Sequence, residues 1–465
     1  RVLLTPESDA ATEAFELDGH YDFRSDVETL NDQQREATRM AAGARKGALI
    51  QGPPGTGKTT VIAHAVRELV SRGNKVLVAA FTNTAVDNIV SSLLDVGLEG
   101  VLRVGDSSRS EDLVRTLERR GDSVERVFSR DLARATCSLD VLADDILERD
   151  VVAMTTHRCS QSALVEFLQN RRGETPFDAV LVDEAAQITE PMTLAAVTLG
   201  KRFVLVGDHE QLPPIVSHER ANSAFLAREE ADPRLEEMGV GGLDRSLFER
   251  LASHLPSTML RKQYRMHSDL MAMPSRTFYD DRLAASSDAA RRTIQLGTGG
   301  DMSDVVGRIL APNHPLVFVD VPGEDAGDGS RTNYAEAEAL VETQRRLLDN
   351  TETSPSVGVV TPYRAQVQLI RQLLVDELGD VAQSIDVDTV ERFQGGERDV
   401  IMLSLVKTDH AGDFLANRRR LNVALTRARS KLVVFGAREC LVVHPLFREL
   451  IEQAQTHVVG WRQSA

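Results

Sequence analysis

The stretch "ALIQGPPGTGKTTVIAHAVREL", residues 48–69, constrains the fold more than any other part of this sequence. A short apolar run leads into Gly52-x4-Gly57-Lys58-Thr59, and an amphipathic helical pattern follows. A strand, a glycine-rich turn with this spacing and a helix are the context of a P-loop. Because backbone N–H groups of such a loop wrap a nucleotide phosphate, we expect an α/β sheet built around a nucleotide site.

The loop residues divide the nucleotide chemistry among them. Lys58 is expected to bring its charge to the β- and γ-oxygens, and the Thr59 hydroxyl is expected to ligate Mg²⁺. The other nucleotide-binding candidates are Gly52, Pro53, Pro54, Gly55, Thr56, Gly57 and Thr60. ATP and Mg²⁺ are therefore the expected cofactors.

Two apolar runs end in acidic residues that could serve this site. "AVLVDEAAQ" supplies Asp183 to hold Mg²⁺ through water and Glu184 to orient or deprotonate the attacking water. "FVLVGDHEQLPP" offers Asp208 as a competing metal carboxylate. The adjacent pair supplies both jobs, so we place hydrolysis at 183 and 184 and give Gln211 a γ-phosphate-sensing or water-positioning role.

Apolar runs alternate with helical patterns along most of the chain. Six runs begin near residues 48, 75, 101, 151, 179 and 203, and five more begin near 316, 357, 385, 400 and 431. This alternation predicts parallel strands with helices on both faces. At 465 residues the chain exceeds one hydrophobic core. The predicted fold is α/β, with two tandem parallel-sheet domains.

The expected domain plan has a polar, acid-rich tail over 1–26, a first domain over 27–255 and a second over 256–465. Charged helical patterns over about 106–150 interrupt the first sheet and predict an inserted helical pair. Covering the sheet and guiding a nucleic acid are equally consistent roles for this insertion.

The charge balance argues against a nucleic-acid partner. Acidic residues number 70 against 54 basic ones, and seven of the latter are lysine, for a net charge of −16. A lysine-poor acidic surface suits a salt-rich cytoplasm, so a halophilic source is one hypothesis and an ordinary acidic protein is the other. Motifs must therefore carry any argument for nucleic acid.

The sequence gives no indication of a membrane protein or of a protein that holds a zinc or iron–sulfur site. It has no apolar run of about 18 residues and no amino-terminal signal pattern, so a cytoplasmic protein without a membrane partner is expected. Cys137, Cys159 and Cys440 lie far apart, which argues against zinc or iron–sulfur sites. The chain starts at Arg1, so an upstream nuclease or accessory domain missing from it is possible.

Ten motifs in a fixed order resemble the superfamily 1B helicases, the group that includes the nonsense-mediated-decay RNA helicase and the replication nuclease-helicase. They are "LNDQQREA", "GPPGTGKTT", "FTNTAVDNIV", "VVAMTT", "VDEAAQ", "GDHEQLPP", "QYRMH", "TPYRAQ", "DTVERFQGGERDVI" and "RRLNVALTRAR", and they span about residues 30–440.

The resemblance implies two RecA-like P-loop domains with ATP in the cleft between them and a single strand across their top. Carried over by position, Gln34 would read the adenine edge, Tyr264 would stack on the ring and Glu397 would bind the ribose. Arg265 would reach the γ-phosphate with Arg427 as its partner. These roles suit a planar aromatic ring and a delocalised cation.

Glu391 departs from this family pattern. The family usually has Asp two residues before the Phe of "FQG", where this sequence has Glu391. The acidic role is expected to survive with a longer side chain.

Polar residues at expected strand ends form a candidate nucleic-acid surface. They are Thr82, Asn83, Thr84, Thr155, Thr156, Thr361, Arg364 and Thr389. Open α/β sheets gather ligands at this edge, although a single threonine there often caps a helix. Because hydroxyls bind phosphate at hydrogen-bond range, we expect single-strand binding with a shallow salt dependence.

The expected function is an ATP-dependent helicase or translocase acting on single-stranded DNA, in replication or repair. The resemblance implies that it steps 5′ to 3′. An RNA helicase of the same group and a nucleic-acid-stimulated ATPase switch are the alternatives. No residue settles DNA against RNA. An inserted β-barrel between Gln34 and the P-loop is not evident.

The basic stretch "RRRLNVALTRARSKL", residues 418–432, is expected to form a helix from about Leu421 through Ala428 that leads into a strand. Arg427 on its flank is the catalytic candidate. Arg420 is a candidate either to support the catalytic residues from behind or to lie on the phosphate side. The other basic residues, Arg418, Arg419, Arg429 and Lys431, are expected to pair with acids or face solvent.

Overall fold

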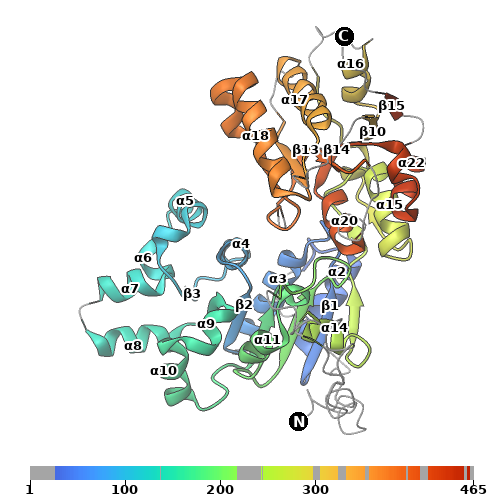
Figure 1. Ribbon diagram of the computed structural model, residues 1–465. Coiled ribbons are helices and arrows are strands. Elements are labelled where there is room, and N and C mark those ends of the chain that lie inside the picture. The colour runs from blue at the N-terminus through green and yellow to red at the C-terminus, as the bar shows by residue number, and fades with distance from the viewer. Residues whose placement is uncertain are drawn as a thin grey trace. The chain divides into compact units, whose positions relative to one another are not determined.

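The computed structural model describes most of the chain (Figure 1). The described residues are 27–136, 138–216, 244–296, 304–322, 331–350, 355–393, 396–408, 417–454 and 458–460, together with Phe23 and Gly242. The predicted tail over 1–26, apart from Phe23, and Cys137 lie outside them. Among the described helices, none has both the length and the apolar character needed to cross a bilayer.

The chain divides into two compact units between Arg261 and Lys262, and Glu210–Leu212 group with the second unit. The sequence placed the boundary after residue 255. The difference arises because a short strand over Ser257–Met259 pairs with the P-loop strand and so belongs to the first sheet.

The first unit holds a seven-stranded parallel sheet in the order β3-β4-β2-β5-β6-β1-β7. Its strands are β1 (Gly47–Gln51), β2 (Val76–Ala80), β3 (Val101–Arg103), β4 (Val151–Thr155), β5 (Ala179–Val182), β6 (Phe203–Gly207) and β7 (Ser257–Met259). The first six match the apolar runs. The sequence did not reveal β7, because a three-residue edge strand starting at an exposed serine carries no apolar run.

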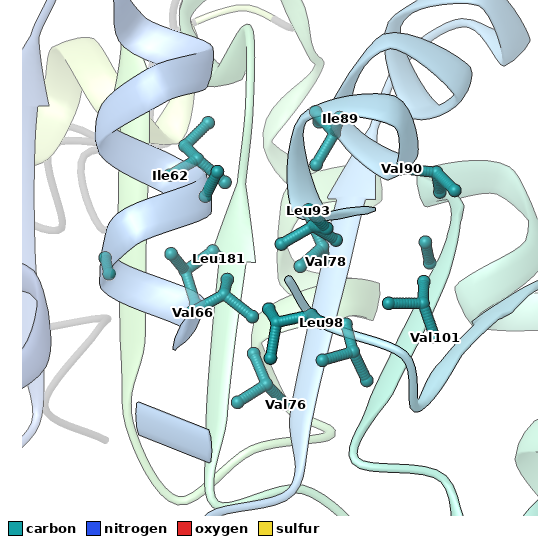
Figure 2. Packing of buried hydrophobic residues seen from close by; sticks show 14 of the residues in the cluster. Ile62, Val66, Val76, Val78, Ile89, Val90, Leu93, Leu98, Val101 and Leu181 are labelled. Atoms are coloured by element: carbon teal, nitrogen blue, oxygen red, sulfur yellow. The ribbon is translucent and has the colours of Figure 1, made fainter. Parts of the chain in front are cut away.

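Helices cover both faces of this sheet, as the continuous apolar strands require. They are α2 (Asp32–Gly43), α3 (Lys58–Ser71), α4 (Asn83–Asp95), α9 (Thr156–Gln161), α10 (Ala163–Arg172), α11 (Glu190–Val197) and α14 (Leu247–Leu251), with η2 (Ala185–Gln187). Figure 2 shows the face under α3 and α4, where Ile62 and Leu93 meet Val78 and Leu181. Alternate strand residues such as Leu77 pack in a second core on the opposite face.

The insertion between β3 and β4 contains four α-helices rather than the predicted pair. They are α5 (Glu111–Arg120), α6 (Val124–Val127), α7 (Ser129–Ala135) and α8 (Leu139–Glu148), preceded by η1 (Ser107–Arg109). Leu113 and Leu117 of α5 and Phe128 join the core under α4. The first part of the insertion therefore covers the sheet.

The second unit holds a six-stranded parallel sheet in the order β12-β11-β13-β14-β10-β15. Its strands are β10 (Leu316–Asp320), β11 (Val357–Thr361), β12 (Asp386–Thr389), β13 (Arg398–Ser404), β14 (Ala428–Gly436) and β15 (Val458–Gly460). A small separate parallel pair joins β8 (Lys262–Gln263) and β9 (Ala284–Ala285). Two tandem parallel sheets confirm the predicted α/β fold class.

The helices of the second unit are α15 (Ser268–Phe278), α16 (Val305–Leu310), α17 (Tyr334–Asp349), α18 (Arg364–Leu378), α20 (Arg418–Leu425), α21 (Arg438–Leu441) and α22 (Pro445–Gln453), with η4 (Ala289–Arg291) and η5 (Gly379–Ser384). On one face of the sheet, Leu340 of α17 and Ile370 of α18 share a core with Val359 and Met402.

The basic stretch does not form the helix that the sequence predicted. Helix α20 ends at Leu425, and β14 already begins at Ala428, which pairs with Arg398 of β13. The prediction failed because strand pairing extends further toward the amino terminus than the apolar run does. Lys431 is also misplaced by the prediction: it is 1% exposed and donates to the carbonyls of Ala311 and His314 at 3.0 and 2.6 Å.

Candidate functional site

The phosphate loop, residues 52–57, joins β1 to α3 in the first unit. Gly55 and Gly57 have φ angles of +72° and +83°, a region in which glycine is free of the strain that a side chain brings. Gly57 is the N-cap residue of α3, so the unpaired N–H groups of the first helical turn lie next to the loop. This geometry provides an anion site at a helix N-terminus.

Lys58 folds back over the loop. Its Nζ donates to the carbonyl of Gly52 at 2.8 Å and lies 4.0 Å from Oε1 of Glu184. A Cβ atom at position 52 would lie 2.1 Å from Cγ of Lys58, so only glycine leaves room for this conformation. The ammonium group is thereby held at the loop, where a phosphate would lie.

Gln34 supports the loop from α2. Its backbone N–H and side chain form a reciprocal capping box with Asn31, and its Nε2 donates to the carbonyl of Thr56 at 3.1 Å. A Cβ atom at Gly57 would lie 2.5 Å from this Nε2. The structure therefore gives Gln34 a loop-bracing contact, and adenine recognition by Gln34 stays a prediction.

Asp183 and Glu184 follow β5 directly. Asp183 is 5% exposed, its Oδ1 accepts from the N–H of Glu184, and Gln187 donates to Glu184 at 2.7 Å. Burial, with the charge of Glu184 as a second cause, raises the pKa of Asp183, and the charge of Lys58 opposes the shift. Two adjacent carboxylates with a surplus of negative charge suit a hard divalent cation.

The metal-ligand prediction names Thr59 on α3 and Asp183 after β5. Serine or threonine hydroxyls and carboxylates are oxygen donors of the kind that Mg²⁺ takes, usually with several waters. Within the described ranges no group of three or more His, Cys, Asp or Glu side chains forms a ready cation site. Because Mg²⁺ keeps several waters and binds phosphate oxygens, Thr59 and Asp183 fit an ion shared with a nucleotide.

The competing carboxylate, Asp208, follows β6. It is buried, and Gln51 donates to its Oδ1 at 3.4 Å. Its neighbour Gln211 belongs to the segment that groups with the second unit.

In the second unit, Arg265, Arg427 and Arg429 form what we term the arginine cluster. Nε of Arg265 donates to Glu397, its Nη1 donates to the carbonyl of Thr426 at 3.0 Å, and Arg429 also pairs with Glu397. Burial would raise the pKa of Glu397, but the charges and hydrogen bonds of Arg265 and Arg429 outweigh it and hold the pKa below its usual range.

Arg427 is the most enclosed member of the cluster, with 2% of its surface exposed. It donates to the carbonyls of Val423 and Gly396 at 3.0 and 3.1 Å and to Oε1 of Gln211 at 3.2 Å. The structure thus brings together two residues, Gln211 and Arg427, to which the sequence assigned roles at the γ-phosphate.

The sequence also pointed to two further residues of this unit, Tyr264 and Glu391. Tyr264 is 40% exposed, and Nζ of Lys262 lies 5.8 Å from its ring centroid. Glu391, the departure from the family pattern, pairs with Arg420 at 2.7 Å. Its carboxylate therefore forms an ion pair with Arg420, a residue of α20.

The predicted strand contacts of the first unit differ in accessibility. Thr82, Asn83 and Thr84 are exposed at the start of α4, and Thr82 caps that helix by accepting from Ala85 N–H at 3.2 Å. Thr155 ends β4 and is half-buried, whereas the side chain of Thr156 is fully buried. Any contact between Thr156 and a nucleic acid would therefore have to be made by the backbone of Thr156.

In the second unit the candidates also follow strand ends. Thr361 and Thr389 pair side by side at the carboxyl ends of β11 and β12, but both side chains are buried. Arg364, the first residue of α18, is exposed. Among the described residues, the exposed candidates are therefore Thr82, Asn83, Thr84 and Arg364.

Two residues at this edge of the first unit escaped sequence reasoning. Phe81 is an exposed aromatic side chain directly before Thr82, and single-stranded nucleic acids stack on such rings. Arg103 is buried and bonded to Asn83. An aromatic residue beside polar strand-end residues was a signal for Phe81, whereas nothing in the sequence pattern pointed to Arg103.

Comparison with protein families matches both units. The AAA domain family AAA_11 matches residues 29–125 and 107–219, and the AAA domain family AAA_12 matches residues 243–439. The chain belongs to the AAA_11/AAA_12 helicase core of superfamily 1B. This is an ATP-dependent helicase family, which implies ATP binding and hydrolysis.

Individual relatives show how much of a longer protein this core represents. The chain is 33% identical over 439 residues to the DNA replication ATP-dependent helicase/nuclease JHS1 of Arabidopsis thaliana, covering 92% of this chain and 30% of that protein. It is 29% identical over 503 residues to the uncharacterized ATP-dependent helicase MJ0104 of Methanocaldococcus jannaschii, covering 92% and 70%. The chain thus spans less than a third of the Arabidopsis relative.

Among solved structures, an arterivirus nonstructural protein 10 helicase complex with DNA is similar, with 16% identity and a TM-score of 0.43. The similarity covers 89% of this chain and 65% of that chain.

Proposed function

We propose that the chain is an ATP-driven translocase that moves 5′ to 3′ on single-stranded DNA and separates duplexes ahead of it. The observation that carries the proposal is the coexistence of a formed phosphate loop with a carboxylate pair in one parallel-sheet unit and an arginine cluster in the other. Replication or repair is the proposed setting, supported by the relatives named as DNA replication helicase/nucleases.

The residues have the following proposed roles. Thr59 and Asp183 hold Mg²⁺, which when bound would neutralise charge on the phosphates. Glu184 positions and deprotonates the attacking water, and Gln211 assists. Arg265 and Arg427 stabilise charge that develops on the γ-phosphate, because a guanidinium spreads its charge over several oxygens.

Two alternatives use the same ATP chemistry. The chain could act on RNA, since the contacts expected here are to phosphates, which both nucleic acids share. It could also be a nucleic-acid-stimulated ATPase switch that remodels complexes without unwinding. A nuclease or accessory domain outside this sequence is a further proposed partner, because the curated helicase/nucleases are much longer.

One strand-displacement experiment separates these functions. Duplexes of DNA and of RNA are prepared with a 5′ or a 3′ single-stranded tail, and release of the labelled strand is followed with ATP and Mg²⁺. We expect release only from the 5′-tailed DNA duplex. ATP hydrolysis stimulated by single strands without release from any duplex would support the switch instead.

The matched control is Glu184→Gln, which keeps the size of the side chain and removes the general base. We expect this variant to retain nucleotide binding and to lose strand-stimulated hydrolysis by about two orders of magnitude or more. Unchanged hydrolysis would remove Glu184 from the proposed mechanism.

A further inference from the structure

Arg103, the last residue of β3, is a buried cation outside the predicted ATP site. It is 2% exposed, and each of its three guanidinium nitrogens donates a hydrogen bond. Nε donates to Oδ1 of Asp87 at 2.7 Å, Nη1 to the carbonyl of Val104 at 2.6 Å and Nη2 to Oδ1 of Asn83 at 2.9 Å. A charge so enclosed is tolerated because it is paired with a carboxylate and each of its three nitrogens donates a hydrogen bond.

The contacts with Asp87 and with the carbonyl of Val104 offset the cost of burying the guanidinium charge. Asp87, on the inner face of α4, neutralises the charge and is itself 9% exposed. Gly105 leaves room for the guanidinium, since a Cβ atom there would lie 3.2 Å from Nη1. The third contact is different, because it extends from this buried pair to a side chain at the surface.

The contact determines how the Asn83 amide is oriented. Arginine has only donors, so the atom that faces Nη2 must be the amide oxygen and the NH₂ group must lie on the other side. Among the described residues the structure shows no hydrogen-bond partner for this NH₂ group, and Asn83 itself is exposed at the first turn of α4. An exposed, oriented donor at a helix N-terminus suits a phosphate oxygen.

We propose that Arg103 is a positioning residue that holds Asn83 so that its amide NH₂ donates to a phosphate oxygen of the bound single strand. The inference rests on the proposed function, because it deepens the strand-binding role of Asn83. Asp87 pairs with the guanidinium and holds it in place, and Arg103 fixes one of the two amide orientations before the strand arrives. Fixing the donor beforehand reduces the entropy lost on binding.

The test is a double-mutant cycle read out by single-strand affinity. Fluorescence anisotropy of a labelled oligothymidine is measured for the wild type, Asn83→Ala, Arg103→Lys and the double variant. Asn83→Ala removes the donor, and we expect about a tenfold loss of affinity, typical of a hydrogen bond to a charged group. Arg103→Lys keeps the charge beside Asp87 but lacks the fork that reaches Asn83, and we expect a loss of about threefold to tenfold.

The decisive result is the double variant. If Arg103 acts through Asn83, Arg103→Lys adds no further loss once Asn83 is alanine. If its role is only structural, the two losses multiply, and that outcome overturns the proposal. An unchanged affinity for Arg103→Lys alone also overturns it.

Asn83→Asp sharpens the cycle without touching the core. It keeps an acceptor for Arg103 and replaces the donor by a negative oxygen, so we expect a larger affinity loss than for Asn83→Ala. Equal or tighter binding would contradict a phosphate contact. Should Arg103→Lys fail to fold by circular dichroism, Asp87→Asn replaces it in the cycle with the same expectation.

The matched control is Arg72→Lys, another arginine–carboxylate pair of the first unit. Arg72 pairs with the buried Glu68 at 3.0 Å at the end of α3 opposite the phosphate loop. Its substitution should leave affinity unchanged. A wild-type protein that binds no single strand would refute the proposed function, whereas wild-type binding with multiplying losses refutes only the role of Arg103.

Strand-stimulated ATP hydrolysis supplies an independent readout. A mispositioned Asn83 should raise the strand concentration needed for half-maximal stimulation and leave the maximal rate unchanged. A lower maximal rate with an unchanged half-maximal concentration would contradict the positioning role.

Discussion

The phosphate loop of the first unit and the arginine cluster of the second are held by contacts of very different range along the chain. In the loop, Thr56 bonds to Pro53, Lys58 to Gly52 and Gln34 to Thr56, separations of 3, 6 and 22 residues. In the cluster, Arg265 bonds to Glu397 and to Thr426, which lie 132 and 161 residues away.

This difference shows which parts of the site a short motif can build. Glycines that permit left-handed backbone and a helix that begins at the loop are local properties, so the loop forms wherever β1 and α3 form. The cluster requires that β14, α20 and the segment before β13 are already packed. We therefore expect substitutions in the cluster to disturb both chemistry and folding, and substitutions in the loop to disturb chemistry alone.

Arg427→Lys should give the largest effect. A lysine cannot satisfy the carbonyls of Val423 and Gly396 and the side chain of Gln211 together, and an arginine that stabilises a transferring phosphoryl group is worth about a thousandfold or more in rate. We expect steady-state ATP hydrolysis to fall by about that factor, with a lowered unfolding temperature and an unchanged single-strand affinity.

Arg448→Lys is the matched control for this variant. Arg448 of α22 also donates to backbone carbonyls, those of Val442 and Val443, but is exposed. Its hydrolysis rate should equal that of the wild type. Equal losses of strand affinity and hydrolysis in Arg427→Lys would assign the basic stretch to nucleic-acid binding.

Gly52→Ala tests the phosphate loop, the other of the two regions compared. Its methyl group would lie 2.1 Å from Cγ of Lys58, so the lysine must leave the loop. We expect a loss of ATP hydrolysis of about a hundredfold, as for removal of one preorganised donor, with the unfolding temperature nearly unchanged. Gly73→Ala, which meets no atom within 4 Å at a φ of +79°, should cost stability only.

A large fall in stability for Gly52→Ala would break the comparison. It would show that the loop conformation contributes to folding of the first unit as the cluster does to the second.

The last prediction concerns the stability of the second unit and rests on Lys431, whose Nζ bonds to carbonyls 120 and 117 residues away. Burial lowers the pKa of Lys431 to about 7. Between pH about 7 and about 10 the unfolded chain holds a proton that the folded chain has lost, so stability rises with pH over this interval.

Lys431→Met removes this titration. Denaturant unfolding of both proteins should show the wild-type free energy of unfolding increasing relative to the variant by a few kcal/mol at most between pH about 7 and about 10. A difference that stays constant over the interval would mean that the ammonium keeps its proton through its bonds to Ala311 and His314.

Much of the fold could be read from the chain because its strands are buried on both faces. Apolar runs such as those of β2 and β5 are long enough to identify without tertiary information. The edge strand β7 could not be read, because an edge strand buries little and needs no apolar pattern. The end of α20 was missed for a related reason, since pairing with β13 decides where β14 begins.

The sequence by itself determined the phosphate loop, the carboxylate pair and the succession of two parallel sheets along the chain. These features depend on local spacing and on the period of apolar residues. Only the tertiary structure decided the partners of the charged groups. Arg103 reaches Asn83, Glu397 joins two arginines and Lys431 is enclosed between backbone carbonyls. Long side chains find their partners through packing between distant segments, and no local pattern records that choice.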